Sequence, residues 1–142
     1  MPTAREILTT KYGAPTKTPS SFIEYWFVRK EFSWFPVSAF EVNKDFKKLL
    51  QAAFKDLQLN GVHTEIATFN GCFVYREVRG KPGVFSIHSW GAAIDLNAKT
   101  NGLGTQGVWS PKFIQIMKRN KIYCGMEWKH RPDPMHFAMV NG

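Results

Sequence analysis

The segment Ser-Ile-His-Ser-Trp-Gly-Ala-Ala-Ile-Asp-Leu-Asn, residues 86–97, decides how the rest of the chain is interpreted. Taken as an extended chain that turns at Gly91, it places alternate side chains on opposite faces. Ser86 and His88 then share one face, and Asp95 lies opposite the apolar side chains of residues 92, 94 and 96. A carboxylate that faces an imidazole across small alanines leaves room for a metal ion.

A third candidate ligand stands near the C-terminus, in the segment Asp-Pro-Met-His-Phe (Asp133–Phe137). The same alternation puts His136 on the face opposite its two apolar neighbours. Together with His88 and Asp95 it gives two imidazoles and one carboxylate, which suits a catalytic Zn²⁺ ion that keeps its fourth position for water. Asp133 precedes His136 by three residues and is close enough to accept a proton from that water.

These residues form the pattern Ser86-x-His88-x-x-Gly91-x-Ala93-x-Asp95, followed by acidic residue-x-x-His136. The pattern resembles the D-alanyl-D-alanine carboxypeptidase and L-alanyl-D-glutamate endopeptidase family. The members of that family are zinc peptidases that cut cell-wall peptides, and many phage endolysins belong to it. The resemblance extends over residues 68–140, about half of the chain.

The resemblance implies that His88, Asp95 and His136 hold one zinc ion and that Asp133 is the general base. Many members have Glu at the base position, so the shorter Asp is a departure from the usual pattern.

An arginine upstream of the first motif polarises the scissile carbonyl in the family. Arg76 and Arg79 are both candidates here. We assign Arg76 to catalysis and Arg79 to substrate binding. Ser86, on the predicted His88 face, is expected to hydrogen-bond substrate or to orient a ligand.

Other polar residues are weighed against this set. Glu127 is a rival base, because it lies on a predicted strand beside that of His136. His63 is expected to be a surface or hydrogen-bonded strand residue, and His130 an exposed turn residue. The two cysteines are too few for a disulfide framework and are expected to stay reduced and half-buried.

The expected fold class is α+β, with a small, mostly antiparallel sheet that carries the zinc site on one face and two or three helices packed on the other. Residues 44–58 form the clearest helix, with one apolar stripe, Asn43 as N-cap and Asn60-Gly61 at its end. Ser110-Pro111 begins a second, short helix. Strands are expected at 22–35, 62–68 and 122–128.

At 142 residues the chain is expected to be one domain, with residues 1–20 as a solvated, basic N-terminal arm that begins with a helical turn over residues 4–9. No apolar run approaches the ~20 residues of a membrane span, and no signal-peptide pattern begins the chain. We therefore expect synthesis in the cytoplasm and action on the cell wall after release.

The formal net charge of +8 suits a polyanionic partner. Bacterial walls are polyanionic, whereas the chain has no nucleic-acid-binding motif and its cations are spread along the sequence. A peptidoglycan peptide is thus the expected partner, with no nucleic acid and with a monomeric protein.

Three functions remain open at this point: a zinc peptidase, a zinc-bearing module that binds wall peptides without cutting them, and a basic nucleic-acid binder. The acid at position 133 favours the peptidase, because a pure binder has no use for a base beside metal-activated water. Short length and the lack of a signal or wall-binding segment favour an L-alanyl-D-glutamate endopeptidase (endolysin) over a D-alanyl-D-alanine carboxypeptidase or dipeptidase.

Overall fold

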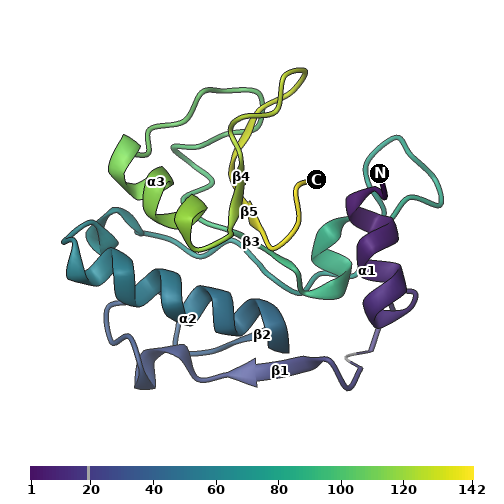
Figure 1. Ribbon diagram of the computed structural model, residues 1–142, viewed down its shortest axis with the longest axis horizontal. Helices are drawn as coiled ribbons and strands as arrows, with labels where there is room; N and C mark the ends of the chain where they lie inside the picture. The colour runs from purple at the N-terminus through teal and green to yellow at the C-terminus, as the bar shows by residue number, and fades with distance from the viewer. Residues whose placement is uncertain (19) are drawn as a thin grey trace.

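The computed structural model describes residues 1–18 and 20–142. In this part of the chain, three α-helices accompany two small antiparallel sheets, one of two strands and one of three, so the predicted α+β class is confirmed (Figure 1). The helices are α1 (Ala4–Tyr12), α2 (Lys44–Leu59) and α3 (Pro111–Arg119). The strands are β1 (Ile23–Trp26), β2 (Phe40–Asn43), β3 (Ala93–Asp95), β4 (Tyr123–Gly125) and β5 (Asp133–Ala138).

Helix α2 forms as its sequence predicts. The side chain of Asn43 caps its first turn by accepting hydrogen bonds from the N–H groups of Asp45 and Phe46. Its apolar stripe is buried, and Asn60 is the C-cap. Strand β2 leads directly into this helix and pairs with β1, from Ile23 opposite Asn43 to Trp26 opposite Phe40.

The three-stranded sheet has the order β3-β5-β4. Ile94 of the edge strand β3, Leu96 just after it and Phe137 of the central strand β5 belong to the main core, together with buried side chains of α2 and α3. Helix α3 starts as predicted, with Ser110 accepting from the N–H of Phe113 and Pro111 in the first turn. Two helices thus cover one face of the sheet and leave the other face for polar residues.

The expected solvated arm at residues 1–20 is wrong for the helical part. Helix α1 is longer than the single turn expected, and Thr3 caps it through the N–H of Glu6. Leu8 is 1% exposed and packs in a second apolar cluster with Ile87 and Trp90. Burial of such a side chain stabilises the docked helix by about 1.5–3 kcal/mol. Residue 19 of the predicted arm lies outside the described residues.

Three strand predictions also need correction. Residues 62–68 contain the 3-10 helix His63–Glu65 instead of a strand, and the N–H groups of Ala67 and Thr68 bind the side-chain oxygen of Asn97 instead of a neighbouring strand. The aromatic segment 22–35 is extended only as far as Trp26. The strand expected at 122–128 is limited to β4.

Several aromatic residues of the segment 22–35 build the core. Trp26, Phe32 and Phe35 are buried around Phe54 of α2. Among the described residues, no helix combines the length and apolar character needed to cross a membrane.

Candidate metal centre

His88 lies in a single turn of 3-10 helix, η3 (Ile87–Trp90), and not in an extended segment as expected. Ser86 caps this turn, since its Oγ accepts a hydrogen bond from the N–H of His88 at 3.3 Å. Gly91 ends it with φ +62°, and a Cβ there would stand 2.8 Å from the backbone nitrogen of Asn43. Only glycine meets both requirements, so the turn at Gly91 is confirmed while the alternation before it is wrong.

Asp95 and His136 meet as cross-strand neighbours. Strands β3 and β5 are antiparallel, with Asp95 directly opposite His136 and Ile94 opposite Phe137. Because side chains alternate along a strand, burying Ile94 and Phe137 in the core sends the polar pair to the other face. Here the alternation argument from the sequence holds.

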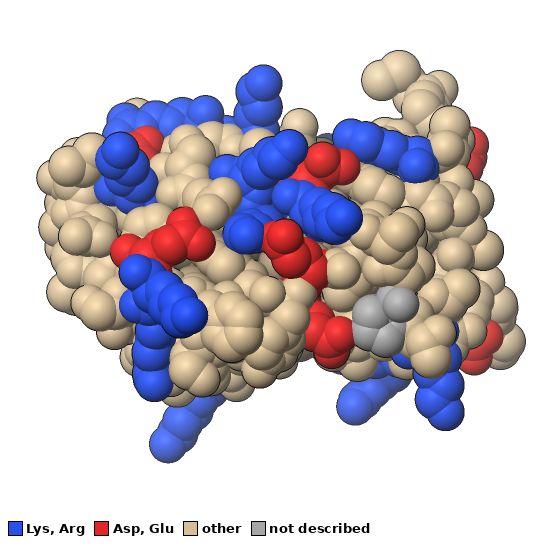
Figure 2. Space-filling view, turned by 90° about the horizontal axis from the view of Figure 1, so that it is seen from below, with Lys and Arg blue, Asp and Glu red and all other residues tan. Residues whose placement is uncertain are grey.

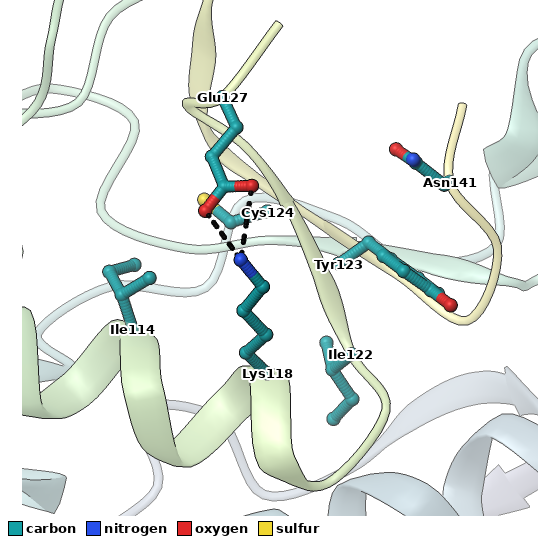
Figure 3. A pocket seen from close by; sticks show the side chains of 7 residues that line it. All are labelled: Ile114, Lys118, Ile122, Tyr123, Cys124, Glu127 and Asn141. Atoms are coloured by element: carbon teal, nitrogen blue, oxygen red, sulfur yellow. Dashed lines mark hydrogen bonds and ion pairs between the residues drawn. The ribbon is translucent and has the colours of Figure 1, made fainter.

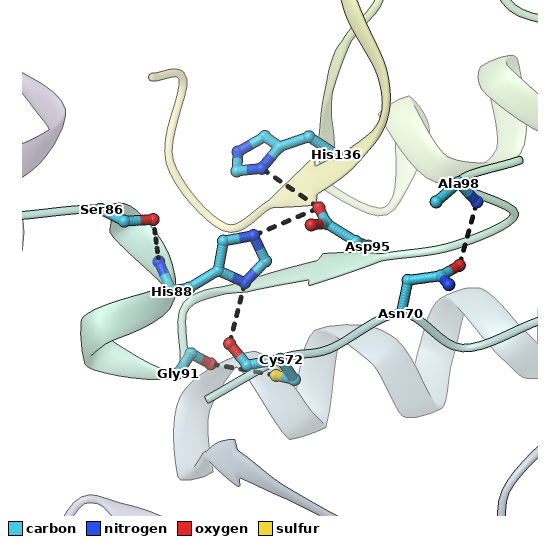
Figure 4. Close-up of polar contacts among 8 residues, drawn as sticks. All are labelled: Asn70, Cys72, Ser86, His88, Gly91, Asp95, Ala98 and His136. Carbon is cyan, nitrogen blue, oxygen red and sulfur yellow. Dashed lines mark hydrogen bonds and ion pairs between the residues drawn. The ribbon is translucent and has the colours of Figure 1, made fainter. Parts of the chain in front are cut away.

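The three predicted ligands converge at one point (Figure 4). His88 Nε2 lies 3.2 Å from Asp95 Oδ1, and His136 Nδ1 lies 3.6 Å from the same oxygen. Both imidazoles are almost fully buried, with 3% of His88 and 6% of His136 exposed. One ligand atom from each residue lies within 4.8 Å of the others.

The hydrogen bond made by His88 Nδ1 leaves the lone pair of its Nε2 at this point. His88 Nδ1 lies 2.9 Å from the carbonyl oxygen of Cys72, and such a contact requires a proton on Nδ1. The Nε2 lone pair of a neutral His88 then faces Asp95 Oδ1, and two acceptors at that distance repel each other unless a cation lies between them. Two imidazole nitrogens and a carboxylate are donors typical of Zn²⁺, so these residues fit the predicted metal.

Asp95 stays ionised at this site. Burial raises the pKa of its carboxyl group, but hydrogen bonds and positive charge from the neighbouring imidazoles of His136 and His88, when these carry the additional proton, outweigh burial. The net pKa is well below the ordinary value. The anionic form, which binds a metal ion, is therefore present at neutral pH.

Asp133 reaches the same face through an irregularity in β5. Cys124 pairs with Phe137, but the next residue of β4, Gly125, pairs with Asp133. Between these two pairs, β5 therefore has three additional residues that β4 lacks. Strict alternation would place Asp133 and His136 on opposite faces. The odd number of extra residues in β5 removes that constraint.

The carboxylate of Asp133 is half-buried, and its Oδ1 has no hydrogen-bond partner among the described residues. Burial raises its pKa above the ordinary value, and the charge on Asp95 acts in the same direction. The positive charges on His136, His88 and Arg76 act the other way without cancelling the rise. Asp133 therefore lies within electrostatic range of the three converging residues.

Arg76 and Arg79 have different surroundings in the structure. The segment from Cys72 to Arg76 runs beside η3, and the carbonyl of Arg76 accepts hydrogen bonds from the N–H of Ser86 and the hydroxyl of Ser89. The side chain of Arg76 is exposed, and its charge acts to lower the pKa of Asp133. Arg79 is exposed in the turn closed by the Val78–Val84 hydrogen bond.

The rival base Glu127 is engaged elsewhere. Its carboxylate binds the ammonium group of Lys118 at 3.1 Å, at a small hollow of about 150 Å³ beside α3 (Figure 3). Both side chains are exposed. Such a surface ion pair contributes about 0–1 kcal/mol and does not direct Glu127 toward His136.

The remaining polar predictions have mixed outcomes. His63 is half-buried against the ring of Trp34 in a 3-10 helix, not on a strand, whereas His130 is exposed as expected. Both cysteines are free, with Cys72 buried and Cys124 half-buried. Burial raises the pKa of the Cys124 thiol to about 12, which makes it a poor nucleophile.

Sequence reasoning missed several supporting groups. The carbonyl of Cys72 orients His88, Trp128 places its ring 5.1 Å from that of His136, and the side chain of Ser89 ties η3 to residues 74 and 76. No motif signals a backbone carbonyl. The serine at position 89 inside the first motif was the one available signal.

Comparison with known proteins supports the resemblance drawn from the motifs. Residues 79–139, somewhat less than half of the chain, match the family model described as D-alanyl-D-alanine carboxypeptidase. The family consists of zinc peptidases that act on peptidoglycan peptides, and the matched range includes all three converging residues and Asp133. Neither a curated protein nor a solved structure matches the chain.

Proposed function

We propose that this chain, whose residues 79–139 match the D-alanyl-D-alanine carboxypeptidase family, is a zinc-dependent peptidase that hydrolyses peptidoglycan stem peptides. The observation that carries the proposal is the convergence of His88, Asp95 and His136, together with a second acid, Asp133, whose Oδ1 has no hydrogen-bond partner among the described residues. A structural zinc site closes its coordination with four protein ligands, whereas three ligands are typical of a catalytic site.

His88 Nε2, an oxygen of Asp95 and His136 Nδ1 would hold the zinc ion. When bound, zinc supplies Lewis acidity to a carbonyl oxygen and makes water more acidic. The hydrogen bond from His88 Nδ1 to the Cys72 carbonyl fixes the tautomer in which Nε2 can donate its lone pair.

Asp133 acts as the general base through its free Oδ1. Its raised pKa makes the carboxylate a stronger proton acceptor than a solvated Asp. Asp133 accepts a proton from the attacking water and then passes it to the leaving amine. General-base assistance of this kind is worth roughly 10²–10⁴ in rate.

Arg76 stabilises negative charge that develops on the scissile carbonyl oxygen. Its backbone is fixed against η3, and its charge acts on Asp133. Arg79, in the exposed turn between residues 78 and 84, binds substrate. Ser86 orients His88 through the turn, because its hydroxyl is used in the N-cap.

A net charge of +8 supports action on the polyanionic bacterial wall. Figure 2 shows lysines and arginines spread over the lower face of Figure 1 and interspersed with acids, not gathered into one stripe. Such a distribution favours electrostatic attraction to an extended polyanion over a dedicated nucleic-acid groove. In this proposal residues 1–142 form one catalytic domain and act as a monomer.

The bond that is cut defines two candidates. The first is the L-alanyl-D-glutamate bond within the stem, as in an endolysin, and it is supported by Asp at the proposed base position 133, which occurs among short phage-type members of the family. The second is the terminal D-alanyl-D-alanine bond, which the description of the matched family favours.

Mass spectrometry of digested peptidoglycan tests this function. The zinc-loaded protein is incubated with purified peptidoglycan, and the zinc-depleted protein is the control. New amino termini on D-glutamate identify the endopeptidase, and release of free D-alanine identifies the carboxypeptidase. Intact stem peptides after incubation with zinc-loaded protein would leave only a binding module and would contradict the proposal.

A further inference from the structure

Helix α1 lies outside the residues that match the family, yet it packs against the turn that carries His88 (Figure 1). Leu8 of α1 joins Ile87 and Trp90 of η3 in one apolar cluster. Ala138 of β5, two residues after His136, belongs to the same cluster. The helix therefore contacts both elements that supply imidazoles to the candidate metal centre.

Two long-range hydrogen bonds fasten α1 to the two ends of this turn. Arg5 Nε donates to the carbonyl oxygen of Phe85 at 2.7 Å, just before the turn begins. Trp90 Nε1 donates to the carbonyl oxygen of Gly13, the C-cap of α1, at 2.9 Å. Both bonds join segments more than 70 residues apart, so they form only when α1 is docked.

The turn leaves His88 little independent movement. The N–H of Gly91 donates to the carbonyl of His88 at 2.9 Å, and the ring of His88 is tied to Cys72. A displacement of Trp90 therefore moves His88 Nε2 relative to Asp95 Oδ1, which lies 3.2 Å away. Metal ligands must be held within a few tenths of an ångström, so groups behind them affect metal affinity.

We infer that α1 is a positioning element of the metal centre and that Trp90 is the positioning residue that couples the two. This inference rests on the proposed zinc site. If a docked α1 raises zinc affinity, zinc must by thermodynamic linkage strengthen the docking of α1. The N-cap of α2 also reaches this turn, because Asn43 Nδ2 donates to the carbonyl oxygen of Trp90 at 3.3 Å, whereas the buried side chains of residues 50–57 of α2 pack in the main core.

Hydrogen–deuterium exchange of the unaltered protein tests the linkage. Amides of residues 4–13 are followed with and without saturating zinc, and those of residues 50–59 in the C-terminal half of α2 serve as the internal reference, because the N-cap of α2 is itself bonded to Trp90. We expect zinc to slow exchange in α1 by a larger factor than in residues 50–59. Zinc binding with unchanged exchange in α1 would overturn the inference and leave the peptidase proposal standing. A wild-type protein that binds no zinc would overturn both.

A matched pair of variants tests the role of Trp90. Trp90→Phe keeps most of the ring and removes the donor to Gly13. Trp34→Phe is the control, because it also removes an indole hydrogen bond, to Gln58, but lies in the other apolar cluster. Zinc affinity is measured by competition with a chelator, and the stability of each zinc-free variant by thermal unfolding.

We expect Trp90→Phe to weaken zinc binding by about 2- to 10-fold, the range for loss of one hydrogen bond. Saturating zinc should restore its turnover, since no reacting group has changed. Trp34→Phe should keep wild-type zinc affinity even where it lowers the melting temperature. Equal zinc affinities of Trp90→Phe and wild type, or equal losses in the two variants, would show that Trp90 is only a packing residue.

Discussion

Gly125 lies so close to Asp133 that a Cβ at position 125 would stand 2.5 Å from the carbonyl oxygen of Asp133 and 3.1 Å from its Cβ. The contact is with backbone, which cannot move aside cheaply. Gly125 is therefore the residue that permits the irregular pairing of β4 with β5 and thereby places the proposed base.

We predict that Gly125→Ala lowers kcat by roughly 10- to 100-fold, because small displacements of a reacting group are costly. Zinc affinity should change little, since the three proposed ligands do not contact position 125. Gly102→Ala is the control, as a Cβ there meets only Thr105 Cγ2 at an ordinary 3.8 Å. Wild-type turnover in Gly125→Ala would show that this contact does not position Asp133.

The two candidate bases can be told apart by isosteric amides. Asp133→Asn should reduce kcat by about 10²–10⁴ while zinc stoichiometry stays at one. Glu127→Gln should keep full activity and change stability by less than ~1 kcal/mol, because its partner Lys118 is exposed. Steady-state kinetics with a stem peptide gives the answer, and the opposite ranking of the two variants would make Glu127 the base.

Alanine substitutions at Gly91 and Gly61 distinguish the cost of backbone strain from the cost of steric overlap. Both have positive φ, but a Cβ at Gly61 meets no atom within 4 Å, whereas one at Gly91 would stand 2.7 Å from Ile23 Cδ1 and 2.8 Å from Asn43 N. Gly61→Ala should cost about 1–2 kcal/mol of unfolding free energy. We expect Gly91→Ala to cost more and also to weaken zinc binding, measured by denaturant unfolding and chelator competition. Similar effects of both substitutions would show that steric overlap at Gly91 adds nothing to the cost of backbone strain.

Acid should weaken the contact between α2 and α3. A hydrogen bond from Arg119 holds the pKa of Asp56 at about 2, below its ordinary 3.8. A carboxyl group whose pKa is lower in the folded state stabilises the fold above its unfolded pKa and loses that contribution as pH falls through the folded value. The melting temperature of wild type should thus exceed that of Asp56→Asn by a constant amount above about pH 5.

Between pH 4 and pH 2 that difference should shrink. Arg119→Gln should show the same pH dependence, because it removes the other partner of the pair. A difference between wild type and Asp56→Asn that persists unchanged to pH 2 would mean that the ion pair does not stabilise the fold.

Much of the fold was predictable because it depends on local signals. Helix α2 has both an apolar stripe and a capping asparagine, and Pro111 marks the start of α3. Because side chains alternate along a strand, the buried neighbours of Asp95 and His136 predicted that these two side chains point to the opposite face of the sheet.

The failures arise where distant groups decide the local structure. Residues 62–68 alternate like a strand, but Asn97 supplies their hydrogen bonds and no neighbouring strand pairs with them among the described residues. The capping serine and left-handed glycine of η3 are five residues apart, which is typical of one helical turn. The apolar alternation of the same residues instead predicts an extended chain. The docking of α1 depends on Trp90, 77 residues away from Gly13, and no local pattern contains it.

The central claim is that two imidazoles and a carboxylate from distant parts of the chain share one metal ion. X-ray diffraction from zinc-loaded crystals, recorded above and below the zinc absorption edge, measures this directly. We predict one anomalous peak, about 2.0–2.2 Å from ligand atoms of His88, Asp95 and His136. A peak bound by other residues, or none in crystals shown to contain zinc, would contradict the account.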